Sequence, residues 1–322
     1  MTILNVGGAG YIGSVATENF IQNGYKVIVL DDLSTGFKQL VHPRAKFIHG
    51  SMLDYKLLDN IFKNNKIDFV TLYAAKIIVP ESMEKPISYY ETNIIGLINV
   101  LKVMKKNKVN NILFASSAAV YGKNNKMPLN ELSKTNPCNP YGTSKLICEK
   151  IITSICNIHK INYVIFRFFN VAGTSDNGKY GMLKKHPSLL IPCINKAIIN
   201  NDPINIFGNK YKTKDGTCLR DYIHVEDLSN AALLALKYLS KNNSNIFCLG
   251  TNKGYTVMDI VKIYKKCFYP KLKYTIKPNR SGDPDKLIAS NSKIRRILNW
   301  QIKYNLEDMI ISDYNFRKKY IK

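Results

Sequence analysis

The stretch that decides the expected fold reads Gly7-Gly8-Ala9-Gly10-Tyr11-Ile12-Gly13. It stands between an apolar run at 3–6 and a helical pattern at 12–23, so a strand turns into a helix there. The spacing is G-x-G-x-x-G counted from Gly8, and G-x-x-G-x-x-G counted from Gly7. Glycines permit the tight turn and let backbone N–H groups approach a pyrophosphate at the helix N-terminus. A dinucleotide site is therefore predicted; the alternative is a glycine-rich turn without a ligand.

Short apolar runs alternate with helical patterns through the first half of the chain. Strands are predicted at 3–6, 26–30, 46–49, 69–74, 111–116 and 163–169, and helices at 12–23, 56–64, 86–106 and 141–159. Strands separated by helices imply a parallel sheet that is covered on both faces. The expected fold class is α/β, with a Rossmann-type, doubly wound parallel sheet.

The pattern loosens after residue 170, where 176–187 and 208–217 are polar stretches rich in turn residues. Loops of this kind commonly carry binding groups. We expect residues 1–172 to form the dinucleotide-binding domain, with a segment at about 219–250 returning to it. Residues 173–322 are expected to form a smaller, C-terminal substrate-binding lobe.

The chain is strongly basic, with a formal net charge of +24. Its 40 lysines outnumber its 7 arginines and are spread along the whole sequence. A nucleic-acid surface would instead concentrate arginines and aromatic residues on one element. We therefore predict a compositional bias and no nucleic-acid partner, with a positive potential that helps to attract a small anionic substrate.

The cysteines and the apolar runs indicate the compartment. The seven cysteines are scattered and form no C-x-x-C, which argues against a disulfide framework and against a zinc site, so no metal is expected. No run approaches the roughly 20 apolar residues that cross a bilayer. The first apolar run is followed at once by glycines, unlike a signal peptide. A cytoplasmic protein without a membrane partner is predicted.

Asp31 and Asp32 end the second predicted strand. A carboxylate at this place hydrogen-bonds the adenosine ribose hydroxyls and repels a 2′-phosphate. Asp32 adds to that repulsion, and no arginine lies nearby in the sequence to offset it. The sequence therefore favours NAD over NADP.

Tyr141 and Lys145 are four residues apart, on one face of a predicted helix. The spacing alone proves little, because Tyr180/Lys184, Tyr269/Lys273 and Tyr314/Lys318 share it. Tyr141 is set apart by its place after Pro140 and downstream of a serine-rich strand end. Oxidation of a hydroxyl requires a base, and a nearby ammonium lowers the pKa of a tyrosine. We predict Tyr141 as the base, with Ser117 relaying the proton and Lys145 favouring the phenolate.

These features together resemble the extended short-chain dehydrogenase/reductases, and most closely the UDP-glucose 4-epimerases. The resemblance spans nearly the whole chain. Its motifs are GGAGYIG (7–13), DDLSTG (31–36), AAK (74–76), VPES (79–82), Asn93, SSAAVYG (116–122), PYGTSK (140–145), RFFNVAG (167–173), IFG (206–208), DGTCLRDYIHVEDL (215–228), RSGDPDKLIAS (280–290) and LNW (298–300).

The resemblance implies specific roles for residues at matching positions. Cofactor contacts are implied for Gly7, Gly10, Tyr11, Ile12, Gly13, Asp31, Asp32, Ser34, Ser51, Met52, Ala74, Lys76, Asn93, Tyr141, Lys145 and Phe169. It implies that the substrate diphosphate is bound by Asn170, Arg220 and Arg280, the uridine ribose by Asp283, the uracil by Leu189, Leu190 and Phe207, and the sugar by Ser117. A homodimer through the helices around 86–106 and 141–159 is also implied. For Arg220 the alternative is an internal ion pair with Asp221.

The chain departs from the family pattern at a few positions. Ser51 replaces an aspartate that contacts the adenine amino group, Leu72 replaces a histidine, and Leu189 replaces an Asn or His near the uracil. Leu287 stands where some members have a tyrosine beside the sugar, which yields the hypothesis that N-acetylated sugars are accepted.

Other reactions of the same fold remain as alternatives. A nucleotide-sugar 4,6-dehydratase needs an additional acid/base pair, and the family provides Asp-Glu where this chain has Ala118 and Ala119. The related decarboxylases tend to have a glutamate there. A non-catalytic, NAD-sensing or nucleic-acid-associated Rossmann protein is a further alternative, but such proteins commonly lack the Tyr/Lys pair. The sequence thus favours reversible oxidation at sugar C4.

Overall fold

The central sheet is parallel throughout. The computed structural model describes residues 1–123, 126–184, 187–279 and 283–320. Within those ranges the strand order is β10-β6-β5-β4-β1-β2-β3, and each pairing is parallel. The strands are β1 Thr2–Val6, β2 Lys26–Asp31, β3 Lys46–His49, β4 Phe69–Leu72, β5 Asn111–Ser117, β6 Asn162–Phe168 and β10 Asn245–Leu249. The predicted α/β class is confirmed.

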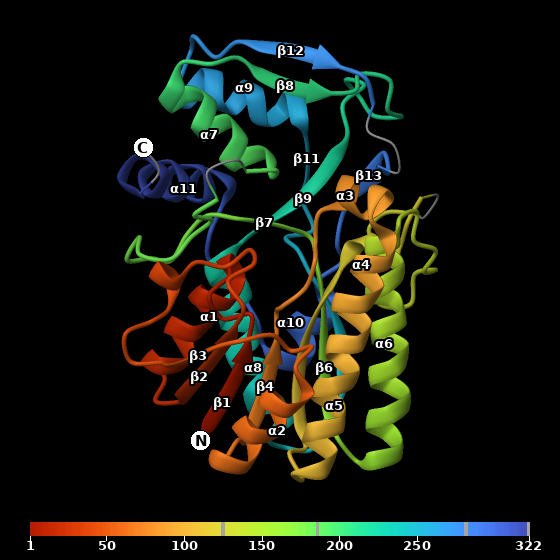
Figure 1. Ribbon diagram of the computed structural model, residues 1–322. Coiled ribbons are helices and arrows are strands. Elements are labelled where there is room, and N and C mark those ends of the chain that lie inside the picture. Colours follow the sequence, from red (N-terminus) through yellow and green to blue (C-terminus); the bar gives the residue numbers. More distant parts are fainter. Residues whose placement is uncertain (124–125, 185–186, 280–282, 321–322) are drawn as a thin grey trace.

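Helices cover both faces of this sheet (Figure 1). One face carries α1 Tyr11–Gln22, α8 Val225–Leu239 and α10 Ser292–Leu298; the other carries α2 Tyr55–Asn64, α5 Gly96–Lys106 and α6 Pro140–His159. Successive strand residues point to opposite faces, so Ile3 and Val29 join one apolar core while Leu4 and Ile28 join the other. The order reverses between β1 and β4, which is where ligands of such sheets bind.

The helical pattern predicted over 86–106 is interrupted in the structure. After α3 Val79–Glu84, the chain forms α4 Pro86–Tyr90, a π-helical segment Glu91–Ile95, and then α5. The wider turn of a π segment is frequent at functional sites. Here it contains Asn93, whose side chain is buried and fully engaged in hydrogen bonds.

A second body of structure lies beyond the carboxyl ends of the strands (Figure 1). One small sheet joins β7 Asn170–Ala172, β9 Leu219–His224, β11 Gly254–Thr256 and β13 Lys286–Leu287; another pairs β8 Ile204–Phe207 with β12 Tyr274–Lys277. Its helices are α7 Leu190–Asn200, α9 Val257–Cys267 and α11 Leu306–Tyr320. In the described ranges, none of the helices has the length and apolar character needed to span a membrane.

Part of the segment 219–250 packs on the main sheet, and part does not. Helix α8 packs against α1, and β10 extends the sheet beside β6. Strand β9 instead pairs with β7, β11 and β13 outside the main sheet. Within this segment, packing on the main sheet begins with α8 at Val225, because β9 makes its hydrogen bonds with β7, β11 and β13.

Candidate active site

The glycine turn is shaped by close backbone approach. Gly7 has a φ of +88°, and a Cβ there would collide with the backbone of Ala74. A Cβ at Gly13 would collide with the Gly7 carbonyl. Gly10 directly precedes α1 and no side chain caps the helix N-terminus, so a phosphate can approach the N–H groups of Tyr11 and Ile12. These features fit a dinucleotide.

Asp31 lies beside this turn at the end of β2. Its carboxylate accepts hydrogen bonds from the N–H groups of Ala9 at 2.9 Å and Leu33 at 2.9 Å. Burial raises the pKa of Asp31, and these two bonds oppose the rise. Asp32 accepts from the N–H of Ser34 at 2.9 Å and from its hydroxyl at 2.6 Å. The acidic pair thus orders the loop that would meet an adenosine ribose.

Asn93 links the segment after β4 to the start of α6. Its amide accepts from the Lys76 N–H at 2.9 Å and donates to the Lys76 carbonyl at 3.1 Å. It also donates to the Ser144 hydroxyl at 2.9 Å, and Ser144 donates to the Tyr141 carbonyl at 2.7 Å. The segment after β4 and the start of α6 are therefore held together.

The remaining cofactor candidates lie at or just beyond the carboxyl ends of β3, β4, β6 and the helix start. The Ser51 hydroxyl accepts from the Leu53 N–H at 3.3 Å, and Met52 is buried beneath Gly96. The N–H of Phe169 donates to the Leu249 carbonyl at 3.0 Å. Tyr11 donates its hydroxyl to the Gly173 carbonyl at 2.6 Å, which joins α1 to the strand β7 region.

The structure brings Ser117, Tyr141 and Lys145 together at the ends of β5 and the start of α6. Asn139 caps α6 by accepting from the Gly142 N–H at 2.8 Å, and Pro140 opens the helix. The Lys145 ammonium donates to the Ala115 carbonyl at 2.7 Å and lies 4.7 Å from the centre of the Phe114 ring. Lys145 is thereby fixed beneath the strand end that carries Ser117.

The pKa values of Tyr141 and Lys145 are governed by burial. Burial raises the pKa of Tyr141, and a hydrogen bond with Ser117 opposes that rise. Burial lowers the pKa of Lys145 to about 8, with Cys148 and Glu149 opposing. The sequence predicts that Lys145 lowers the pKa of Tyr141. In the structure the ammonium instead bonds the Ala115 carbonyl, and burial governs Tyr141.

A second group of candidates gathers around β9. Arg220 is buried, and its Nη2 lies 2.7 Å from Oδ1 of Asp283. Burial opposes the charged form of Arg220, but the Asp283 carboxylate keeps the pKa of the guanidinium raised. Asn170 pairs with Tyr222 in the strand register, and Leu287 pairs with Arg220. This small sheet thus collects residues from segments far apart in the sequence.

The alternative of an Arg220–Asp221 ion pair is wrong, because neighbouring strand residues point to opposite sides. Asp221 accepts hydrogen bonds from the Thr251 N–H at 2.7 Å, the Thr251 hydroxyl at 2.6 Å and the Asn252 N–H at 3.0 Å. It orders the turn after β10 while Arg220 faces Asp283.

The predicted uracil residues lie in the second body. Leu189 precedes α7, Leu190 begins it, and Phe207 ends β8 with 37% of its surface exposed. Arg280 lies outside the described residues.

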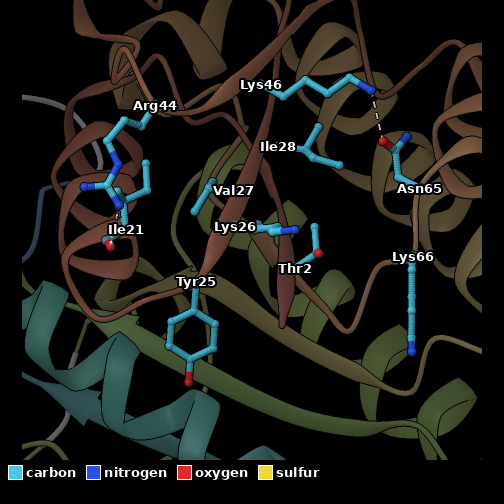
Figure 2. Close-up of a pocket in the computed structure, with 10 residues that line it drawn as sticks. All are labelled: Thr2, Ile21, Tyr25, Lys26, Val27, Ile28, Arg44, Lys46, Asn65 and Lys66. Atoms are coloured by element: carbon cyan, nitrogen blue, oxygen red, sulfur yellow. Dashed lines mark hydrogen bonds between the residues drawn. The ribbon is translucent and has the colours of Figure 1, made fainter.

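A cavity of about 550 Å³ at the opposite end of the sheet is not part of this site. It is lined by residues at the amino ends of the strands, including Thr2, Lys26 and Lys46. Figure 2 shows Lys46 extending to the Asn65 side chain, while Arg44 reaches the Ile21 carbonyl. These cations point in different directions and do not form a shared anion site.

Sequence reasoning did not single out Glu149 and Arg167, which form a buried ion pair behind Lys145 and Ser117. A signal was present, because Arg167 is the one charged residue within the apolar strand NYVIFRF. A buried charge needs a partner.

A family model described as "NAD dependent epimerase/dehydratase family" matches residues 3–250. The chain belongs to this family. The UDP-glucose 4-epimerase of Lactobacillus helveticus is 43% identical over 325 aligned positions, covering 100% of this chain and 98% of that protein. The resemblance to UDP-glucose 4-epimerases is confirmed.

Solved structures of family members show the same fold. The UDP-glucose 4-epimerase of Bifidobacterium longum, in complex with NAD⁺ and UDP, matches with a TM-score of 0.95 and 34% identity, covering 99% of this chain and 98% of that one. The UDP-Glc/GlcNAc 4-epimerase of Campylobacter jejuni matches with a TM-score of 0.84 and 36% identity, covering 99% of each chain.

Proposed function

We propose that the chain interconverts UDP-glucose and UDP-galactose by NAD-dependent oxidation and re-reduction at sugar C4. The observation that carries the proposal is the placement of Tyr141 and Lys145 at the start of α6 beside the strand end that bears Ser117, with the Lys145 ammonium on the Ala115 carbonyl, at the same edge of the sheet as the glycine turn. The confirmed family and relatives that are named UDP-glucose 4-epimerases support it.

The glycine turn, Asp31 and the Asn93-ordered loop would hold NAD. Gly7, Gly10 and Gly13 leave room for a pyrophosphate at the N-terminus of α1. Asp31 and Asp32 suit ribose hydroxyls and disfavour a 2′-phosphate. Bound NAD would supply reversible hydride transfer at the sugar carbon.

Tyr141 would take the proton of the 4-hydroxyl and later return it. The Ser117 side chain opposes the rise in the pKa of Tyr141 and would share the same sugar hydroxyl, so a proton could pass between them. Because burial disfavours a phenolate, Tyr141 needs added positive charge to act as a base at neutral pH. Bound NAD⁺ would bring one such charge; Lys145 lies one helical turn along α6, with its ammonium held by the Ala115 carbonyl.

The β9 region would bind the UDP part. Arginine suits a diphosphate, since its planar group donates hydrogen bonds in pairs. Arg220 would exchange part of its pairing with Asp283 for the diphosphate, and Asp283 would accept from the uridine ribose. Asn170, Arg280, Leu189, Leu190 and Phe207 complete the proposed set. Firm binding at this end leaves the sugar free to turn.

Ala118 and Ala119 favour epimerisation over dehydration. They form the 3₁₀ turn Ala118–Val120 directly after Ser117, and their methyl groups can neither donate nor accept a proton. A 4,6-dehydratase would require an acid and a base near this place.

The deciding experiment supplies UDP-galactose and no added nicotinamide cofactor. We expect UDP-glucose to form until both sugars are present at equilibrium, because each hydride taken up is returned. Formation of a 4-keto-6-deoxy product would instead indicate a dehydratase, and unchanged UDP-galactose in NAD-loaded protein would contradict the proposal.

The domain division, location and oligomer belong to the same proposal. Residues 1–172 with α8 and β10 would hold NAD, and the rest of 173–322 would bind the substrate. A cytoplasmic location fits the buried thiols of Cys148 and Cys156, which form no disulfide, as is usual in a reducing compartment.

The proposed homodimer would form through helices α4 and α6. Ile87 on α4 and Ile158 on α6 are each 71% exposed, which fits an interface on these helices. Ile87→Glu combined with Ile158→Glu should give a monomer by light scattering.

A further inference from the structure

A buried ion pair joins the catalytic helix to the sheet. Nη2 of Arg167 on β6 lies 2.7 Å from Oε2 of Glu149 on α6, and Nε donates to Oε1 at 3.0 Å. Both side chains are about 5% exposed or less. Two parallel hydrogen bonds of this kind fix the relative orientation of the two groups.

The same carboxylate reaches the strand that carries Ser117. The Ser116 hydroxyl donates to Oε1 of Glu149 at 2.5 Å. Glu149 is four residues after Lys145 and eight after Tyr141, so all three share one face of α6. Glu149 therefore connects the end of β5 to the face of α6 that carries Tyr141 and Lys145.

Arg167 extends the network to the segment after Ser117. Its Nη1 donates to the Tyr121 hydroxyl at 3.0 Å and to the Glu131 carbonyl at 3.2 Å. The Tyr121 hydroxyl donates to the Asn130 carbonyl at 2.8 Å. Strand β5, strand β6, helix α6 and the loop after the 3₁₀ turn are thus bonded to one charged pair.

We propose that Glu149 is a positioning residue of the proton-transfer site, which aligns Tyr141 and Lys145 with Ser117 and places a negative charge on the residue one helical turn after Lys145. The inference rests on the proposed function, because Tyr141 and Lys145 are the groups that it positions. Stability alone is a weak reason for such a pair, since buried ion pairs often contribute no more than well-packed apolar residues.

The surroundings of Lys145 identify the charge that acts on it. Its own helix contributes Tyr141, Cys148 and Glu149, β5 contributes the Ala115 carbonyl and the Phe114 ring, and β6 contributes Arg167. Burial raises the pKa of Cys148 to about 12, so this thiol is neutral near pH 8. Burial lowers the pKa of Lys145 to about 8, and Glu149 opposes this. Removing the Glu149 charge should therefore lower that pKa further.

The test compares Glu149→Gln with the double variant Glu149→Gln/Arg167→Met. Lysine-labelled, NAD-loaded protein is titrated by NMR, with Lys145 assigned through Lys145→Met, and the pH dependence of kcat is measured with UDP-galactose. In Glu149→Gln we expect Lys145 to lose its proton about one pH unit lower than in the native protein. The alkaline decline of kcat should move down equally.

The double variant separates positioning from structural support. Removing both charges leaves no unpaired buried charge, so much of the lost thermal stability should return. The Lys145 titration should nevertheless stay displaced, by less than in Glu149→Gln, because loss of the Arg167 cation partly opposes loss of the Glu149 anion. Asp313→Asn, which breaks the equally buried Asp313–Arg317 pair of the second body, controls for destabilisation and should leave the Lys145 titration in place.

An unmoved Lys145 titration in Glu149→Gln overturns the inference, as does a double variant in which stability and titration both return to native values. These outcomes are independent of the proposed reaction, because the titration is read without turnover. Failure of native protein to convert UDP-galactose would contradict the proposed function alone.

Discussion

The proposed proton-transfer end and the proposed nucleotide end of the site are built in different ways. At the first, Lys145 is buried and bonded to the Ala115 carbonyl, and Glu149 with Arg167 holds the helix behind it. At the second, Arg220 is buried but pairs with Asp283, whose side chain is 31% exposed. One end has its polar groups fixed by the protein core, while the other presents a partly exposed ion pair that a ligand can rearrange.

The difference matches what each end has to do. Proton transfer requires a base held in place relative to the reacting atom. Binding a nucleotide diphosphate requires a cation that can leave its partner in the protein and pair with the ligand. We therefore expect substitutions at the first end to lower kcat and substitutions at the second to raise KM.

Replacing Tyr141 by Phe gives the largest expected effect. The ring is kept and only the hydroxyl is lost, so the fold should persist while kcat falls at least about a thousandfold. Turnover of UDP-galactose measures this, and Tyr269→Phe is the matched control, since Tyr269 precedes Lys273 at the same spacing and bonds Asn201 instead. A Tyr141→Phe variant with native turnover would remove the catalytic assignment.

Replacing Arg220 by Met tests the other end. Charged hydrogen bonds to a diphosphate contribute a few kcal/mol, so KM should rise about 100-fold with a smaller change in kcat. The steady-state parameters measure the split. Asp283→Asn, which releases Arg220 from its partner, is the companion variant. A fall in kcat at unchanged KM for Arg220→Met would break the proposed contrast between the two ends.

The two ends were also unequally predictable from the sequence. Ser117, Tyr141 and Lys145 lie at a strand end and a helix start, so local sequence context, rather than the Tyr/Lys spacing alone, predicted their position in the fold. The Arg220–Asp283 pair depends on β9 aligning with β13, a non-local register that no pattern in the sequence reveals. The sequence instead offered Asp221 as the alternative partner.

The main sheet was predictable because its strands are buried on both faces and alternate with amphipathic helices. The π segment Glu91–Ile95 was not, because its apolar pattern continues that of the flanking helices. It forms where the buried Asn93 amide meets Lys76 and Ser144, which are tertiary contacts.

Leu287 tests how the space between the two ends of the site affects the choice of sugar. It is paired with Arg220 in the strand register and buried against the cluster that contains Tyr121 and Phe169. If its size admits an N-acetyl group, the native protein should convert UDP-N-acetylglucosamine, and Leu287→Tyr should lower that activity relative to UDP-galactose about tenfold. The ratio of kcat/KM values measures this, with thermal unfolding as the control for overpacking. No native activity on the N-acetylated sugar would contradict the hypothesis.

The smallest expected effect concerns stability at the proton-transfer end. Burial lowers the pKa of Lys145 to about 8, whereas an unfolded lysine titrates near 10.4. Between these values the unfolded chain binds more protons than the folded protein, so the contribution of this group to stability rises with pH. Lys145→Met removes the buried charge and should therefore raise Tm by a few degrees at pH 7, with the gain shrinking towards pH 10.

Thermal unfolding of both proteins across this range, without added nucleotide, measures the effect. Lys102→Met on the exposed side of α5 controls for the loss of a lysine as such. A Tm difference that is constant from pH 7 to 10 would show that Lys145 holds its proton in the folded protein as tightly as in the unfolded chain. In that case burial would not govern this group, and the two ends of the site would no longer differ in how strongly the core constrains their charges.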